Sequence, residues 1–391
     1  MERRKNKLWG RRTTMLLFLC FVLVLLCGCS GWKSITPPMR ETEATEATPI
    51  PESELLETMD QARAFIEKMA HDGAEEFTLV CSEEIYDFLL RTTYKTDGWE
   101  RKAYHSLLDQ AGFYDYGTVT AGLKRTITVY VISLYPGYEI LRSIETGKED
   151  TLSSKLKKTL EEARSIAETC QTSDPLETAE NIQRILCSQV SYANMTNMSD
   201  VDTAVGPLLN GVADCDGYAD AFYLIGNLAG LEVRYQHGMA SYYDEEESKL
   251  VTSSHMWNLL KIDGSWRVVD VCWADGSRGV DYTWFNIGKD RASRSRIWYE
   301  ELTVPLLETT DLSTRPETEY SVTSYEELEA AMKEAIGKEQ SSFTIIFDRD
   351  NYGSRGEAFD VLWNLYNGEV SYYWDECTRA LTLILEETGA N

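Results

Sequence analysis

The feature that most constrains this chain is the pair Asp263-Gly264, which lies between two stretches with the alternating pattern of β-strands. Asp-Gly in this setting is among the strongest short signals for a hairpin with a two-residue turn. A hairpin centred on the pair places Trp257 opposite Asp270. Because side chains alternate along a strand, His255 shares a face with Trp257 and becomes a diagonal neighbour of Asp270. Diagonal neighbours lie roughly 7–8 Å apart, so we expect a His–Asp hydrogen bond.

A helix is predicted to begin at Cys215. Apolar residues at helical spacing follow this cysteine, and Gly230 is suited to end the helix. The free N–H groups and the dipole at a helix start favour a thiolate. A cysteine nucleophile needs a base close to its sulfur, and the base needs a third group that fixes its tautomer. We therefore predict a catalytic site with Cys215 as nucleophile, His255 as base and Asp270 as orienting group. Taken singly, each also has a purely structural interpretation.

Four motifs around these residues resemble, in the same order, the pattern of the bacterial transglutaminase-like superfamily: Cys215-Asp-Gly-Tyr-Ala219, His255-Met-Trp-Asn258, Asp263-Gly-Ser-Trp266 and Asp270-Val-Cys-Trp273. Upstream, Tyr192 and residues 203–210 look like the family's lead-in. The resemblance covers roughly residues 178–290. It implies an α+β fold with a papain-like core, in which the nucleophile helix packs on an antiparallel sheet. It also implies the same catalytic roles for the three residues.

Three positions depart from the family pattern. Asp214 stands where the family usually has an apolar residue, and a carboxylate beside the thiol would raise the thiol pKa. Met256 replaces a residue that is often small, and Cys272 replaces a threonine. The hairpin register places Cys272 opposite His255, so one interpretation is a disulfide with Cys215 that closes the site. The interpretation we favour is that Cys272 fills the volume of the threonine.

Aromatic residues are abundant near the motifs. Tyr218, Trp257 and Trp273 are candidate substrate-binding residues, although packing in the core or hairpin is the alternative that we favour. The backbone N–H of Cys215 is the natural oxyanion donor, and the sequence identifies no side-chain donor.

Residues 1–28 are interpreted as a lipoprotein signal peptide. Six basic residues precede an apolar stretch, 15–26, that is too short to span a bilayer comfortably. The following Leu26-Cys27-Gly28-Cys29 resembles the bacterial lipobox, which implies that Cys29 becomes a lipidated N-terminus; an uncleaved signal anchor is the alternative. Two acyl chains would hold the protein stably on the extracytoplasmic face of the cell membrane. Residues 29–54, acidic and punctuated by proline, are predicted to be a flexible tether.

Composition excludes several classes of partner and ligand. The formal charge is −26, and loss of the signal peptide would make it −31, so we do not expect binding to nucleic acid or to an anionic membrane face. A basic partner fits this charge, but solubility near a surface is the explanation that we prefer. The nine cysteines contain no C-x-x-C pair and only four histidines are present, so we predict neither a metal nor another cofactor.

Two segments that flank the catalytic region look like small α/β modules. Residues 55–148 and residues 318–391 each show the order helix, strand, helix, strand, and Phe343-Thr-Ile-Ile-Phe347 echoes Phe77-Thr-Leu-Val-Cys81. A duplication is our interpretation, and a shared generic pattern is the alternative. The region between them, 149–310, is predicted to be the transglutaminase-like domain.

These predictions together describe an extracytoplasmic, lipid-anchored thiol acyl-transfer enzyme that acts on peptide or protein amides. Surface proteins or cell-wall peptides would be its substrates. Water would make it a peptidase or amidase, and an amine acceptor would make it a crosslinking, transglutaminase-like enzyme. One alternative is a catalytically inactive transglutaminase-like module that binds a cell-surface protein or the cell wall. Another is a wall-binding structural lipoprotein in which Cys215 is dispensable.

Overall fold

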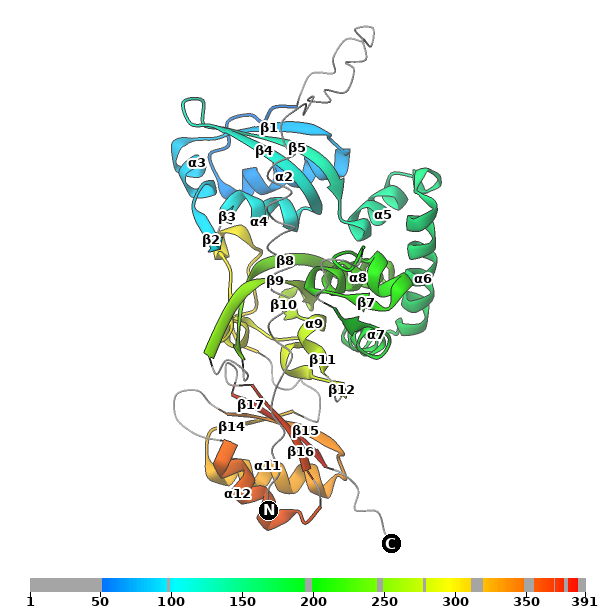
Figure 1. Ribbon diagram of the computed structural model, residues 1–391, viewed down its shortest axis with the longest axis vertical. Coiled ribbons are helices and arrows are strands. Elements are labelled where there is room, and N and C mark those ends of the chain that lie inside the picture. Colours follow the sequence, from blue (N-terminus) through cyan, green and yellow to red (C-terminus); the bar gives the residue numbers. More distant parts are fainter. Residues whose placement is uncertain are drawn as a thin grey trace, which may run out of the picture. The chain divides into compact units, whose positions relative to one another are not determined.

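The computed structural model describes residues 51–96, 99–193, 199–244, 249–276, 279–310, 319–347, 355–368, 370–375 and 379–385. All of them belong to one compact unit, Ile50–Asn391. The predicted signal peptide, Cys29 and most of the predicted tether lie outside the described residues. Figure 1 shows the chain coloured along its sequence. No helix among the described residues has the length and apolar character needed to cross a bilayer.

The first segment builds a three-stranded antiparallel sheet with strand order β1-β5-β4. Buried apolar side chains from its helices and sheet form one core, which includes Ile66, Phe77 and Phe113. Residues 52 and 56 form parallel bridges to Thr78 and Cys81, beside β1. The elements are α2 (Met59–Asp72), β1 (Glu76–Val80), α3 (Glu83–Leu89), β2 (Thr92–Thr96), β3 (Trp99–Lys102), α4 (Ala103–Gln110), β4 (Phe113–Ala121) and β5 (Thr126–Leu134).

The central segment places helices on one face of a four-stranded antiparallel sheet with order β10-β9-β8-β13. Its helical elements are α5 (Pro136–Glu145), η1 (Glu149–Thr151), α6 (Ser154–Cys170), α7 (Pro175–Gln189), η2 (Gly206–Asn210), α8 (Cys215–Leu228), α9 (Val271–Ala274), η3 (Tyr282–Trp284), α10 (Lys289–Ala292) and η4 (Glu300–Leu302). Its strands are β6 (Ser191–Tyr192), β7 (Val212–Ala213), β8 (Glu232–Asp244), β9 (Lys249–Ile262), β10 (Ser265–Val269), β11 (Asp275–Gly276), β12 (Gly279–Val280) and β13 (Arg296–Ile297).

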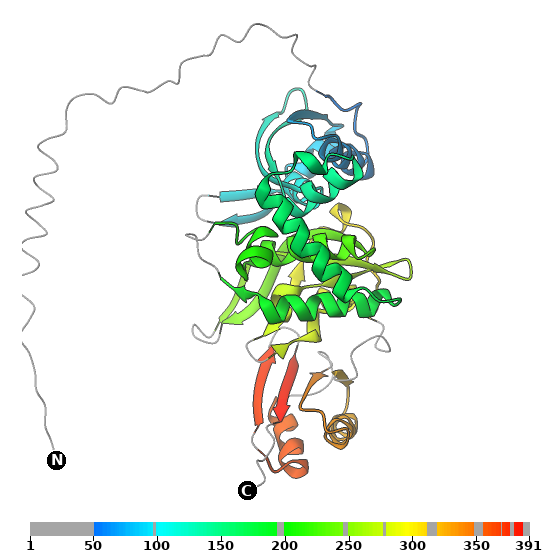
Figure 2. The same ribbon diagram turned by 90° about the vertical axis from the view of Figure 1, so that its right-hand side faces the viewer.

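Helix α8 is central to this segment because it packs against β8 and β9 on one side and against α6 and α7 on another. Figure 2 shows these helices, in the green part of the chain, covering the sheet. Phe222, Leu224 and Ile225 of α8 are fully buried in the core. Ile140 of α5 joins the same core, although the sequence analysis assigned residue 140 to the first module. The predicted fold class, an α+β papain-like core with a helix on an antiparallel sheet, is confirmed.

The predicted hairpin is present, with β9 and β10 on either side of the Asp263-Gly264 turn. Both turn residues have positive φ, 50° and 77°, which is the conformation that favours Asp-Gly. The predicted register is confirmed up to the pair Asn258–Val269. The strand then ends, and residues 271–274 turn into α9. The prediction that Cys272 lies opposite His255 in the sheet is therefore wrong.

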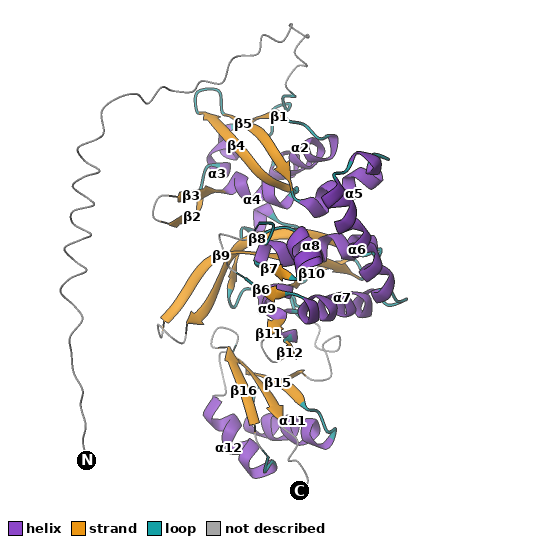
Figure 3. Cartoon of the chain, turned by 45° about the vertical axis from the view of Figure 1, so that its right-hand side comes forward, coloured by secondary structure: helices purple, strands orange, loops and turns teal. Residues whose placement is uncertain are grey.

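The C-terminal segment forms a four-stranded sheet with order β14-β15-β17-β16, against which two helices pack (Figure 3). Strands β14 and β15 are parallel, and the other pairs are antiparallel. The elements are β14 (Glu319–Val322), α11 (Tyr325–Gly337), β15 (Ser342–Phe347), α12 (Arg355–Leu365), β16 (Val370–Asp375) and β17 (Ala380–Leu385).

The first and last segments share topology and small details. The hydroxyls of Thr78 and Thr128 meet at 2.9 Å across β1 and β5, and those of Thr344 and Thr382 meet at 2.9 Å across β15 and β17. Just before the last strand of each sheet, Arg125 and Arg379 have positive φ, 50° and 55°. The interpretation as a duplication, like the predicted domain boundaries, stays a prediction.

Candidate active site

Cys215 is the first residue of α8, as the sequence predicted. The side chain of Asp214 caps this helix by accepting hydrogen bonds from the N–H groups of Asp216, at 3.0 Å, and Gly217, at 3.2 Å. A side chain at position 217 would collide with the backbone, since a Cβ there would lie 2.1 Å from the carbonyl oxygen of Val201. Asp214, which departs from the family pattern, therefore has a local structural role as the N-cap.

His255 and Asp270 form the predicted pair. The distance from His255 Nε2 to Asp270 Oδ2 is 2.8 Å, and both side chains are buried. The other carboxylate oxygen, Oδ1, accepts a hydrogen bond from the N–H of Trp273 at 3.1 Å, because Asp270 is the N-cap of α9. With Nε2 bound to the carboxylate, Nδ1 is the ring nitrogen that remains for the thiol proton.

A buried arginine that the sequence analysis did not identify also binds Asp270. The Nη2 group of Arg296, on β13, donates to the same Oδ2 atom that His255 contacts. Burial alone would raise the pKa of Asp270, but the interactions of this carboxylate with His255 and Arg296 outweigh burial and hold the pKa well below its ordinary value. The carboxylate is therefore ionised throughout the neutral range. Nothing in the local sequence around residue 296 signals this contact.

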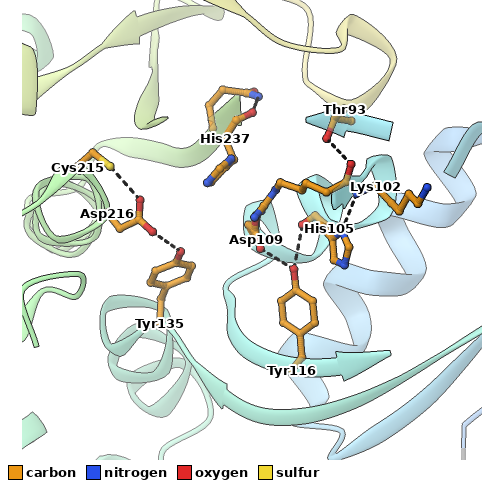
Figure 4. A network of polar contacts seen from close by, with 11 residues as sticks. Thr93, Lys102, His105, Asp109, Tyr116, Tyr135, Cys215, Asp216 and His237 are labelled. Carbon is orange, nitrogen blue, oxygen red and sulfur yellow. Dashed lines mark hydrogen bonds and ion pairs between the residues drawn. The ribbon is translucent and has the colours of Figure 1, made fainter. Parts of the chain in front are cut away.

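The thiol of Cys215 is not hydrogen-bonded to His255 in this structure. It donates instead to Asp216 Oδ1 at 3.3 Å, and Asp216 Oδ2 accepts from the hydroxyl of Tyr135, also at 3.3 Å (Figure 4). Of the predicted hydrogen-bonded cluster, the structure therefore contains the His255–Asp270 bond but not the Cys215–His255 bond. The backbone N–H of Met256, directly after His255, faces the sulfur.

In the resting structure, ionisation of the Cys215 thiol is strongly disfavoured. Burial makes the largest contribution to a pKa well above the ordinary value, and Asp216, Cys272 and Asp214 add to it in that order. The sequence analysis anticipated the effect of Asp214 correctly in direction. The expected preference of the helix start for a thiolate is outweighed in this conformation, since only the Met256 N–H acts in the opposite sense.

Acidic groups crowd the helix start. Burial and the neighbouring carboxylate of Asp216 raise the pKa of Asp214 to about 7, so this carboxyl group is partly protonated near neutral pH. Asp214, Cys215 and Asp216 are the one group of potential metal ligands among the described residues, with ligand atoms within 4.8 Å of one another. The group includes the thiol proposed as nucleophile, and it contains no histidine.

Cys272 lies on α9 and remains a free thiol, as does every other cysteine that the structure describes. Burial makes the largest contribution to the raised pKa of Tyr192, and Cys272 and Cys215 add to it. The structure therefore contains no Cys215–Cys272 disulfide, in line with the filler interpretation. Cys377 lies outside the described residues.

The three candidate substrate-binding aromatics fall into two groups. Tyr218 is fully buried, with its hydroxyl bonded to Asp275, and Trp257 is 1% exposed. Neither can line an open groove, so the substrate-binding prediction is wrong for these two residues. Trp273 is only partly buried, and its ring centroid lies 5.3 Å from that of His255. It stays a candidate.

A small pocket, with a cavity volume of about 30 Å³, lies where the first segment meets the central sheet. Its walls include Arg101 and Gln110 from the first segment, His237 and Gly238 from β8, and Trp298 after β13. Gly238 pairs with His255 across the strands, so the pocket adjoins the strand position of the predicted base. Burial, Arg101 and His255 hold the pKa of His237 well below its ordinary value, so this imidazole is neutral at physiological pH.

Fold and site together define a transglutaminase-like domain with a papain-like core. Comparison with known proteins leads to the same class: residues 163–271, which include all three predicted catalytic residues, match the family model of the transglutaminase-like superfamily. The match covers less than half of the chain, and Arg296 lies beyond it. No curated protein matches this chain.

The similar solved structures have low sequence identity to this chain. A TGase crystal structure has 11% identity and a TM-score of 0.24, with 50% of this chain and 51% of that chain covered. The periplasmic domain of TgpA from Pseudomonas aeruginosa, bound to ethylmercury, has 15% identity and a TM-score of 0.26, with 38% and 55% covered. A protein from Cytophaga hutchinsonii assigned as a cysteine protease has 11% identity and a TM-score of 0.24, with 44% and 64% covered. The chain thus spans between about half and two thirds of these structures.

Proposed function

We propose that this protein is a thiol acyl-transfer enzyme that acts on peptide or protein amides. The observation that carries the proposal is the buried His255–Asp270 pair, bonded at 2.8 Å, beside a cysteine at a helix start. A base with a fixed tautomer next to a nucleophile is the arrangement that covalent acyl transfer requires.

The reaction begins when His255 Nδ1 accepts the proton of Cys215 and the sulfur attacks the amide carbonyl carbon. The resulting oxyanion is stabilised by the backbone N–H of Cys215. His255 then gives its proton to the leaving amine as the C–N bond breaks, which leaves a thioester on Cys215. Water releases an acid, whereas an amine forms a new amide; the site's residues are compatible with both outcomes.

Activation requires the thiol to leave Asp216. In the resting arrangement the thiol of Cys215 donates its proton to Asp216 Oδ1 and not to His255. A rotation about the Cα–Cβ bond of the cysteine would bring the sulfur toward His255. Since apo sites often hold looser catalytic hydrogen bonds than substrate complexes do, binding of an amide beside Trp273 is the natural trigger.

The location of the enzyme belongs to the same proposal. The basic segment, the apolar segment and the lipobox-like Leu26-Cys27-Gly28-Cys29 support a lipid anchor on Cys29 and exposure on the outer face of the cell membrane. Surface proteins or cell-wall peptides are then the accessible amides.

Selective labelling of Cys215 tests the proposal. The purified protein would be treated with a limiting amount of iodoacetamide near neutral pH, and each cysteine would be quantified by peptide mass spectrometry. Cys215 should react first, and His255→Ala should slow it at least tenfold without changing Cys81 or Cys170, which are buried and remote from the site. Profiling of cleaved and crosslinked surface proteins in cells with Cys215→Ala then separates hydrolysis from transamidation.

The second candidate function is a binding module without turnover. The hydrogen bond from Cys215 to Asp216 and the raised pKa of the thiol favour it. If Cys215 reacts no faster than Cys272 and is insensitive to His255→Ala, this second function replaces the first.

A further inference from the structure

The guanidinium group of Arg296 is buried among tryptophan side chains. The residue is 2% exposed, and its guanidinium carbon lies 3.5 Å from the ring centroid of Trp284 and 4.2 Å from that of Trp273. Trp257 lies further away, at 5.8 Å. Stacking on indole rings stabilises a planar cation and fixes its orientation, which a lysine ammonium would not match.

The backbone around β13 positions this arginine. Arg296 belongs to the two-residue strand β13, which pairs with β8 through Ala240. A Cβ at Gly238 would lie 2.5 Å from the carbonyl oxygen of Ile297 and 2.6 Å from the Trp257 ring. The glycine therefore permits the close approach of β13 to the sheet, and with it the position of the guanidinium group.

The guanidinium group meets the catalytic carboxylate at the atom that also binds the histidine. Oδ2 of Asp270 accepts from both Arg296 and His255, and the carboxylate is 1% exposed. An ionised carboxylate in such a place needs a compensating charge. Without Arg296 the one compensating group in contact with this carboxylate would be a protonated His255. Arg296 balances the charge of the carboxylate without requiring a proton on the imidazole.

We propose that Arg296 is a positioning residue that neutralises Asp270 and so keeps His255 unprotonated, ready to accept the thiol proton. The inference rests on the proposed acyl-transfer function, and it assigns a fourth member to the site outside the stretch that matches the family model. In the described part of the chain, further ionisable groups that act on this histidine or on its partners are Asp216 at the start of α8, Cys187 on α7, His237 on β8 and Cys272 on α9.

The proton affinity of His255 tests the proposal directly. The chain has only four histidines, so ring NMR signals of ¹³C,¹⁵N-histidine in the purified protein can be assigned with single His→Gln variants. In Arg296→Gln, the pH midpoint at which His255 loses its proton should rise by roughly one unit or more. The acid limb of kcat/KM should move by the same amount wherever activity is measurable. Arg296→Lys, which retains the charge, should titrate closer to the wild type.

A matched control comes from the same sheet. Arg267 on β10 is also buried and donates to Asn286 at 3.1 Å, so Arg267→Gln removes a buried arginine without touching the site. Its His255 midpoint should equal that of the wild type. An Arg296→Gln protein that is folded and titrates like the wild type overturns the proposal. If Arg296→Gln does not fold, Arg296→Met, which retains packing against the tryptophans, carries the same expectation.

Failure of both substitutions to fold, with Arg267→Gln folded, would make Arg296 a structural residue and overturn the proposal. The titration does not require a substrate. A shifted His255 midpoint in a protein without detectable acyl transfer would therefore support this inference while contradicting the proposed function.

Discussion

At the scale of single residues, neighbouring ionisable groups set the protonation states of Cys215 and Asp270. The thiol of Cys215 faces Asp216 and Asp214, and each of these charges raises its pKa. In contrast, His255 and Arg296 hold the carboxylate of Asp270 ionised. The base is thus prepared for reaction while the nucleophile is held in its protonated state. In the resting structure the thiol is therefore protonated, although the His255–Asp270 pair is in place.

Asp214→Asn should make the thiol more reactive. The asparagine oxygen can still cap α8, but the negative charge is removed. Because the pKa of Asp214 is about 7, the wild-type charge is present mainly above that pH, and the effect should grow as pH rises. We expect the rate constant of Cys215 alkylation at pH 8 to increase roughly three- to tenfold.

The control for this substitution is Asp174→Asn, which changes the N-cap of α7 far along the chain from the site. Asp174 accepts from the N–H of Leu176 at 2.9 Å, so its capping role is equivalent. It should leave the alkylation rate unchanged. An equal or lower rate in Asp214→Asn would show that this charge does not limit the thiol.

The catalytic pair could be predicted from the sequence because its determinants are local. An Asp-Gly turn and the alternation of side chains bring His255 near Asp270 over 15 residues. Arg296 and Tyr135 could not be predicted in this way. They reach the site across 26 and 81 residues through tertiary packing, and no periodic pattern around them encodes the contact.

At the scale of elements, the position of α8 depends on one buried carboxylate. Asp220 accepts hydrogen bonds from the N–H of Gly137 on α5, the N–H of Ala204 and the hydroxyl of Tyr235 on β8. It therefore joins α8 to a helix, a loop and the sheet. Its pKa is raised to about 6 by burial, and these hydrogen bonds act in the opposite sense.

Gly137→Ala should disturb this junction. A Cβ at position 137 would lie 2.3 Å from Asp220 Oδ1, so either α5 or the carboxylate must shift. Overpacking of this kind costs about 1–3 kcal/mol. Urea unfolding would measure the loss of stability, and alkylation of Cys215 would report whether α8 has moved.

Gly337→Ala provides the matched control, because the added Cβ would meet nothing within 4 Å in helix α11. This substitution should be neutral or slightly stabilising, since alanine has the higher helix propensity. If the two variants are equally stable, the α5–α8 contact does not position the nucleophile helix.

Strands were harder to predict than helices for a physical reason. The sequence analysis identified no strand at β4 or β16 in the flanking segments. Strand β4 has only one fully buried side chain, Phe113, so its sequence lacks the alternation that burial of one face produces. Strand β5 lies between two neighbours and alternates clearly at Ile127 and Val129. Position in the sheet, which the local sequence does not encode, decided which strands were detectable.

At the scale of the whole molecule, buried acids should make stability depend on pH. The folded-state pKa values of Asp214 and Asp220, about 7 and about 6, lie above the ordinary value of 3.8. A raised pKa means that the folded protein binds more protons than the unfolded chain does over this range. The stabilisation is therefore complete below about pH 4 and is lost as pH rises to about 7. Asp270 acts in the opposite sense only in strong acid. The lowered pKa values of His105 and His237 also act in the opposite sense, and they do so as pH falls below about 6.5.

Asp214 and Asp220 should therefore raise the melting temperature at pH 5 relative to pH 8, whereas His105 and His237 should lower it. The net charge of −26 also favours mild acid through reduced repulsion, so the difference alone does not identify the groups responsible. Asp214→Asn separates the two causes, because it removes a local titration and changes the total charge by only one. The variant should show a smaller difference between pH 5 and pH 8. A full wild-type difference in Asp214→Asn would assign the effect to general repulsion.

We expect a lipid on Cys29 to anchor the whole chain to the extracytoplasmic face of the cell membrane. Cys27, two residues earlier, supplies a control, because it is also a cysteine but does not stand at the position of the lipobox that receives the lipid. Cells grown with an alkyne fatty acid should label the wild type and Cys27→Ala, and should not label Cys29→Ala. Two acyl chains anchor stably where one does not, so loss of the label should also release mature protein from washed membranes. Equal labelling of Cys29→Ala would place the lipid elsewhere, and tight membrane association without label would favour an uncleaved signal anchor.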